Sequence, residues 1–125
     1  MSCCCGSGEK VKMLYSCSGN ANTGYLADRV FRKLKSGGDL SGTCLSAVGA
    51  DLSGFILTAR NSEQNIVLDG CRVACGKKIF DKRDLPYTHF IMTDFGVEKG
   101  DTEITDEIVD RICSEIRSKA GNCNG

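Results

Sequence analysis

The chain has 125 residues, of which 16 are lysine or arginine and 16 are aspartate or glutamate, so its formal net charge is zero. This length suits one domain with its own core, and the charge balance provides no field that would attract nucleic acid or an anionic membrane. No apolar run approaches the roughly 20 residues of a membrane-spanning helix, and the polar start of the chain is unlike a secretory signal. We therefore expect a single-domain cytoplasmic protein with neither nucleic acid nor a membrane as its partner.

The chain contains nine cysteines, an odd number. Since a reducing cytoplasm disfavours structural disulfides, metal binding or redox chemistry explains them better than a disulfide scaffold does. We expect a flexible cysteine-rich segment at 1–9, a single α/β domain at 10–120 and a flexible tail at 121–125. The first segment holds three consecutive cysteines, Cys3, Cys4 and Cys5.

The first predicted unit is a strand followed by a helix. Residues 11–16 read as a strand that ends in a glycine-containing turn. Apolar side chains then recur every four residues at Leu26, Val30 and Leu34, and Gly37 supplies a typical helix C-terminus. This spacing predicts an amphipathic helix.

The middle of the chain is predicted to repeat this alternation. Residues 43–48 read as a short buried strand or an extended loop, and residues 52–61 read as a helix. The apolar run 66–68 predicts a strand, and the spacing from Cys71 to about Lys82 predicts the helix after it.

A last strand and helix follow Pro86, which biases the residue before it away from helix. Residues 88–93 are rich in β-branched and aromatic side chains, as strands are. Thr105 suits the N-cap of a final helix, whose apolar stripe consists of Ile108, Ile112 and Ile116.

This alternation with right-handed crossovers predicts a small three-layer α/β/α sandwich with a mostly parallel four-stranded sheet. Ligands bind such sheets beyond the carboxyl ends of the strands. Residues that follow the predicted strands should therefore gather at one edge: Cys17, Cys44, Cys71, Cys75 and Asp94.

Cys71 and Cys75 are four residues apart, a spacing that puts two side chains on one face of a helix, where they could share a metal ion. Cys71 would begin that helix, where free N–H groups stabilise a thiolate, so we expect it to be the more reactive of the two. The alternative is that these cysteines only fill a core, as free cysteines often do.

Several stretches carry a resemblance to a known family: Y-S-C-S-G, L-A-D, C-L-S-A-V-G-A, I-V-L-D-G-C-R-V-A-C-G-K-K and T-D-F-G-V-E-K. From about residue 10 to residue 99 the chain resembles the DGC-domain proteins, which take their name from the tripeptide at 69–71. The resemblance implies zinc as the ligand and names no reaction. The zinc-binding residues that it implies are Cys17, Cys44, Cys71 and Cys75.

The leading hypothesis is therefore a zinc-binding protein whose four-cysteine shell has a structural or metal-handling role. A closed shell leaves no open position for water, which argues against an enzyme. The alternatives are a thiol redox or sulfur-handling protein that uses Cys71 with Cys17 or Cys75, a site for copper(I) or an iron–sulfur cluster, and a module that binds a partner protein.

The remaining candidates have supporting roles. Asp69 and Asp94 end strands, where they could orient the cysteine loops from a second layer around the metal or simply cap helices and turns. His89 lies within a strand pattern and is expected to be structural, and Cys113 follows the apolar stripe of the last helix and is expected to pack.

Overall fold

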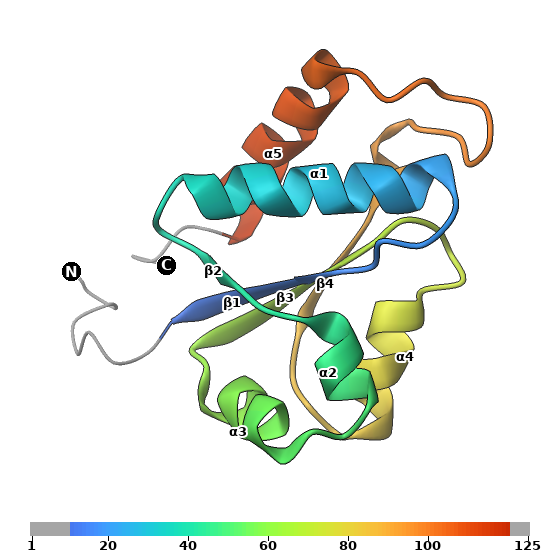
Figure 1. Ribbon diagram of the computed structural model, residues 1–125. Coiled ribbons are helices and arrows are strands. Elements are labelled where there is room, and N and C mark those ends of the chain that lie inside the picture. The colour runs from blue at the N-terminus through green and yellow to red at the C-terminus, as the bar shows by residue number, and fades with distance from the viewer. Residues whose placement is uncertain (1–10, 121–125) are drawn as a thin grey trace.

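The computed structural model describes residues 11–120 (Figure 1). The predicted flexible ends, 1–9 and 121–125, lie outside the described residues, as do the cysteines that they contain.

Four parallel strands form the sheet, in the order β2-β1-β3-β4. Leu14 lies opposite Ile66 on one side and Gly42 on the other, so β1 is a central strand. The strands are β1 (Lys12–Ser16), β2 (Ser41–Gly42), β3 (Gln64–Asp69) and β4 (Thr88–Ile91).

Helices cover both faces of the sheet, as predicted for a three-layer sandwich. Figure 1 shows α1 and α5 on one face and the three shorter α-helices on the other. The helices are α1 (Asn22–Ser36), α2 (Leu45–Gly49), α3 (Ser53–Asn61), α4 (Cys75–Lys82), the 3₁₀ helix η2 (Met92–Phe95) and α5 (Asp106–Ala120).

The alternation of side chains along the buried strands produces a core on each face. Leu14, Ile66 and Leu68 pack toward α1 and α5, while Tyr15 and Val67 pack with Phe80 and its neighbours on the opposite face. The chain can therefore bury β1 and β3 on both sides, as parallel sheets require.

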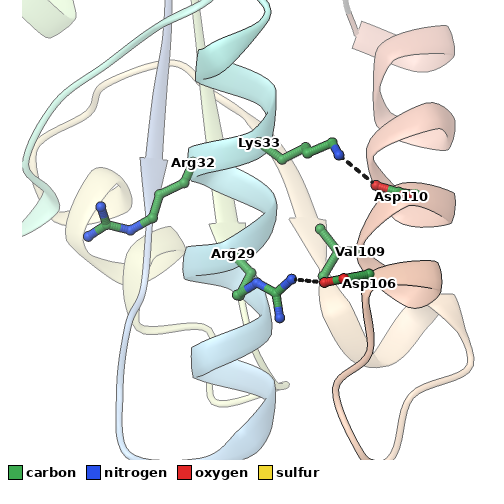
Figure 2. A pocket seen from close by; sticks show the side chains of 6 residues that line it. All are labelled: Arg29, Arg32, Lys33, Asp106, Val109 and Asp110. Carbon is green, nitrogen blue, oxygen red and sulfur yellow. Dashed lines mark hydrogen bonds and ion pairs between the residues drawn. The ribbon is translucent and has the colours of Figure 1, made fainter.

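Complementary charges join α1 and α5 (Figure 2). Arg29 pairs with Asp106, and Lys33 Nζ lies 2.9 Å from Asp110 Oδ1.

Cys113 is buried between α1 and α5. Its Sγ donates to the Val30 carbonyl at 3.7 Å, and burial raises the pKa of the Cys113 thiol. Its predicted packing role is confirmed.

Three boundaries differ from the sequence prediction. Residues 43–48 form neither a strand nor an extended loop, because β2 ends at Gly42 and α2 begins at Leu45. The predicted strand 88–93 ends at Ile91, where the chain turns into η2.

The third difference concerns the candidate site. The helix predicted from Cys71 begins only at Cys75, because Ala74 adopts a left-handed backbone (φ 57°) that helices do not continue through. Cys71 therefore stands in the turn before α4 and not on the same helical face as Cys75.

The buried phenol of Tyr15 predicts a loss of stability in alkali. Burial raises the pKa of Tyr15 to about 12, whereas an unfolded tyrosine ionises near 10. Between these values the unfolded chain releases a proton that the folded chain keeps, so stability should fall as pH rises from about 10 to about 12. Urea unfolding across this range should show a shallower decline for Tyr15→Phe than for the unchanged chain.

Tyr25 provides the control, since its side chain is exposed. Tyr25→Phe should leave the alkaline decline as it is. Equal declines for the unchanged chain and Tyr15→Phe would contradict the prediction.

Candidate metal or thiol site

The four predicted cysteines lie at the carboxyl edge of the sheet. Cys17 directly follows β1, Cys44 lies between β2 and α2, Cys71 follows β3 by two residues, and Cys75 begins α4. Because β2, β1 and β3 are parallel neighbours, the three loops leave the sheet on the same side (Figure 1).

All four have free thiols that the core does not use. Cys17 and Cys71 are half-buried, and Cys44 and Cys75 are exposed. Their exposure contrasts with that of Cys113, which is 4% exposed and packs in the core. The alternative that the four only fill space is therefore wrong for these positions.

The structure brings Cys17 and Cys44 together in the wall of one hollow, and Cys71 and Cys75 lie outside its lining. Within residues 11–120, no three histidine, cysteine, aspartate or glutamate side chains are placed so that they could hold a metal ion as they stand. The loops share an edge, but their side chains do not form a closed shell in this conformation.

Cys71 has a charged neighbour that the sequence analysis did not select. The ammonium of Lys99 donates to Cys71 Sγ at 3.4 Å. Lys99 belongs to the loop between η2 and α5, 28 residues further along the chain. A cation at this distance attracts a negatively charged sulfur.

Asn22 fixes the loop that carries Lys99. At the start of α1, its amide nitrogen donates to the carbonyls of Glu98 and Thr102 at 3.1 and 2.8 Å, and its Oδ1 accepts the Gly100 N–H at 2.6 Å. The same stretch of sequence, T-D-F-G-V-E-K, contributes to the family resemblance, and that was the available signal for Lys99.

Asp94 contacts the turn of Cys71 through Arg72, the residue that follows Cys71 in the chain. The Arg72 guanidinium forms an ion pair with the Asp94 carboxylate, and both side chains are largely exposed. The pair joins η2 to the turn before α4.

The sequence model of the DGC domain family matches residues 13–116, which is most of the chain. The chain belongs to the DGC domain family. It is 26% identical over 92 residues to the anaerobic and virulence modulator AnvM of Pseudomonas aeruginosa, a match that covers 73% of this chain and 70% of the relative. No solved structure matches it.

The aspartate of the DGC tripeptide holds the start of α4. Asp69 is 1% exposed, and its carboxylate accepts the N–H groups of Gly76 at 2.8 Å and Lys77 at 3.0 Å. Helix N-termini have free N–H groups that a carboxylate satisfies. Asp69 therefore fixes the helix that carries Cys75, which is the capping role that the sequence analysis gave as one of two alternatives.

His89 completes this buried contact from β4. Its Nε2 lies 2.7 Å from Asp69 Oδ2, and its side chain is 15% exposed. The imidazole is thus hydrogen-bonded within the fold, as expected of a structural histidine. The DGC aspartate in this way joins three elements: β3, α4 and β4.

The glycine of the tripeptide allows close packing against α1. A Cβ at Gly70 would lie 2.6 Å from the Thr23 carbonyl carbon and 2.7 Å from the Gly24 nitrogen, both backbone atoms. The Cys71 turn and the first turn of α1 therefore meet at the site edge because residue 70 has no side chain.

Proposed function

We propose that this DGC domain binds zinc through Cys17, Cys44, Cys71 and Cys75 and has a structural or metal-handling role. The observation that supports it best is the position of four free thiols, none packed in the core, at one edge of the sheet. Thiolates are the ligands that zinc prefers in structural sites.

The proposal also covers compartment and partner. The compartment is the reducing cytoplasm, in which these thiols stay free, and the partner is a metal ion, with neither nucleic acid nor a membrane. None of the helices described is long and apolar enough to cross a bilayer.

The donor set fits zinc in number and type, and ligation requires the cysteine side chains to turn toward one another. The exposure of Cys44 and Cys75 leaves their side chains free to do so. Bound zinc would link the loops after β1, β2 and β3 to the start of α4. Asp69 and Asp94 would support the site by holding α4 and the Cys71 turn in place.

Cys71→Ser tests the ligand assignment. Zinc content, measured by mass spectrometry after anaerobic purification without a metal-affinity tag, should fall from about one ion per chain to near zero. Ligand bonds made only in the folded state add to folding free energy. A chelator should therefore lower the melting temperature of the unchanged protein and leave that of the variant unaltered.

Cys113→Ala is the matched control, because it removes a buried thiol far along the chain from the site. It should cost stability and retain zinc. An unchanged zinc content in Cys71→Ser would remove that residue from the ligand set.

A second candidate function is thiol redox chemistry at Cys71, and the Lys99 contact is the observation that favours it. Cys71 as thiolate would attack a disulfide substrate and release one substrate thiolate. Cys17 would then attack the mixed disulfide and release the second. One disulfide is reduced, and one forms between Cys17 and Cys71.

Alkylation rates test this candidate. Cys71 should react faster than the other described thiols, and Lys99→Gln should slow it by about fivefold, since one nearby cation is removed. Lys78→Gln removes an exposed lysine on α4 and should leave the rate unchanged. Equal rates in all three proteins would rule out activation by Lys99.

A further inference from the structure

Two helix starts flank the point at which the strand order of the sheet reverses. In the order β2-β1-β3-β4, the chain continues from β1 to β2 on one side and from β3 to β4 on the other, so the reversal lies between β1 and β3. Open α/β sheets bind ligands beyond the carboxyl ends of the strands at this point. The loops that follow β1 and β3 lead into α1 and α4, which cover opposite faces of the sheet (Figure 1).

The start of α4 has its acceptor within the protein, whereas the start of α1 has none among the described residues. Asp69 accepts the N–H groups of Gly76 and Lys77 in α4. In α1 the N-cap is Ala21, which makes no side-chain cap, and the first turn contains no acidic residue. The N–H groups of residues 22–24 donate to no acceptor within residues 11–120. Free N–H groups and the helix dipole make such an end attractive to an anion.

A buried hydroxyl without a partner belongs to this first turn of α1. Thr23 is fully buried, and its Oγ1 has no hydrogen-bond partner within residues 11–120. Helical side chains incline toward the N-terminus of their helix, so this hydroxyl lies on the side of the open N–H groups. Buried hydroxyls of native proteins are almost always hydrogen-bonded, and an oxygen of a bound anion would be the acceptor that Thr23 lacks.

No other helix start among the described residues combines these features. The other buried side-chain atoms without a partner in this part of the chain are Tyr15 Oη, Asn65 Oδ1 and Thr93 Oγ1, and none of them belongs to the first turn of an α-helix. The start of α5 is capped by Thr105 and carries two acidic residues. The start of α3 also lacks a side-chain cap, but it has no buried hydroxyl without a partner.

A cation is held at the same end of α1. Asn22, the first residue of α1, fixes the loop that carries Lys99. The Lys99 ammonium donates to Cys71 Sγ at 3.4 Å, and Gly70, next to Cys71, packs on the backbone of the first turn of α1. The Asp69 carboxylate, by contrast, binds α4 on the opposite face of the sheet. The charges nearest to the open N–H groups are therefore suited to an anion.

We infer that the start of α1 binds a tetrahedral oxyanion with the chemistry of phosphate. The N–H groups of residues 22–24 and the Thr23 hydroxyl donate to its oxygens, and Lys99 offsets its charge. Donors that converge from one helical turn and one loop suit an anion with several oxygens better than a single-atom ion such as chloride. None of these donors is one of the proposed zinc ligands, so the inference goes beyond the proposed function and does not depend on it.

The test uses the full 125-residue chain, reduced and free of metal. Inorganic phosphate, added at constant ionic strength, should shift the amide NMR signals of residues 22–24 and raise the melting temperature, whereas chloride should do neither. A free phosphate ion and a phosphomonoester share this chemistry, and phenyl phosphate in a parallel titration distinguishes them. Tighter binding of phenyl phosphate would assign the site to an ester, and equal or weaker binding would assign it to the free ion.

Thr23→Val is the decisive variant, because valine has nearly the shape of threonine and lacks the hydroxyl. Since Oγ1 has no partner within residues 11–120, the variant should be at least as stable as the unchanged chain when phosphate is absent. Its phosphate affinity should fall by about tenfold, the effect of one lost hydrogen bond to a charged group. Thr93→Val is the matched control, since it removes another hydroxyl without a partner, in η2, and should leave phosphate binding unchanged.

Lys99→Gln is the second variant and should also weaken phosphate binding, more at low salt than at high salt. Unchanged phosphate affinity in Thr23→Val would overturn the inference. So would phosphate-dependent shifts that spare residues 22–24 in the unchanged chain, a result that needs no variant to fold.

The outcome is separate from that of zinc binding, because phosphate binding is measured on metal-free protein. A protein that takes up no zinc and still binds phosphate at the start of α1 would contradict the proposed function alone. A protein that binds zinc and shows no phosphate-dependent shift at residues 22–24 would contradict this inference alone.

Discussion

Asp69→Ala is expected to lower the free energy of unfolding by about 3 kcal/mol, because it removes the partner of three buried or half-buried groups. The N–H groups of Gly76 and Lys77 and the imidazole of His89 all contact this carboxylate. Urea unfolding of the metal-free protein measures the loss without any contribution from a ligand.

The matched control is Asp94→Ala, which removes an exposed carboxylate from its ion pair with Arg72. Exposed pairs contribute about 0–1 kcal/mol, so this variant should unfold almost as the unchanged chain does. If the two variants had equal stability, Asp69 could not be the residue that holds α4 to the sheet.

Gly70→Ala is expected to cost about 2–3 kcal/mol, the range for overpacked positions. The new Cβ would approach the backbone of Thr23 and Gly24 to within 2.7 Å or less. Backbone atoms at a helix start yield less readily than the end of a flexible side chain, so the first turn of α1 would have to move. Thermal or urea unfolding of the variant measures this cost.

Gly54→Ala is the control for the general effect of adding a methyl group. A Cβ at Gly54, within α3, meets nothing within 4 Å. Its stability should be unchanged or higher by up to about 1 kcal/mol, since alanine restricts the unfolded chain. Similar results at both glycines would show that packing against α1 is unimportant.

These expectations give the DGC tripeptide a structural meaning in addition to a chemical one. Asp69 holds α4, Gly70 admits α1, and Cys71 then stands where the two helix starts and the Lys99 loop meet. We infer that the aspartate and the glycine position the cysteine.

The sequence alone predicted the sandwich and most of its elements. Alternating apolar strands and amphipathic helices have periods of 2 and 3.6 residues, and these local patterns are visible in one chain. α1, α3 and α5 appear where the spacing placed them, and Thr105 caps α5 with a side-chain contact to Ile108 N–H at 3.3 Å. α2 was missed, because a helix of five residues is too short to show a period.

The positions of the cysteines at one edge followed from the parallel direction of the strands, which the alternation of strands and helices predicted. The tertiary structure decided what each cysteine contacts. The left-handed Ala74 separates Cys71 from α4, and Lys99 reaches Cys71 from 28 residues away because Asn22 fixes its loop. Such contacts depend on the close approach of distant segments, which no local periodicity encodes.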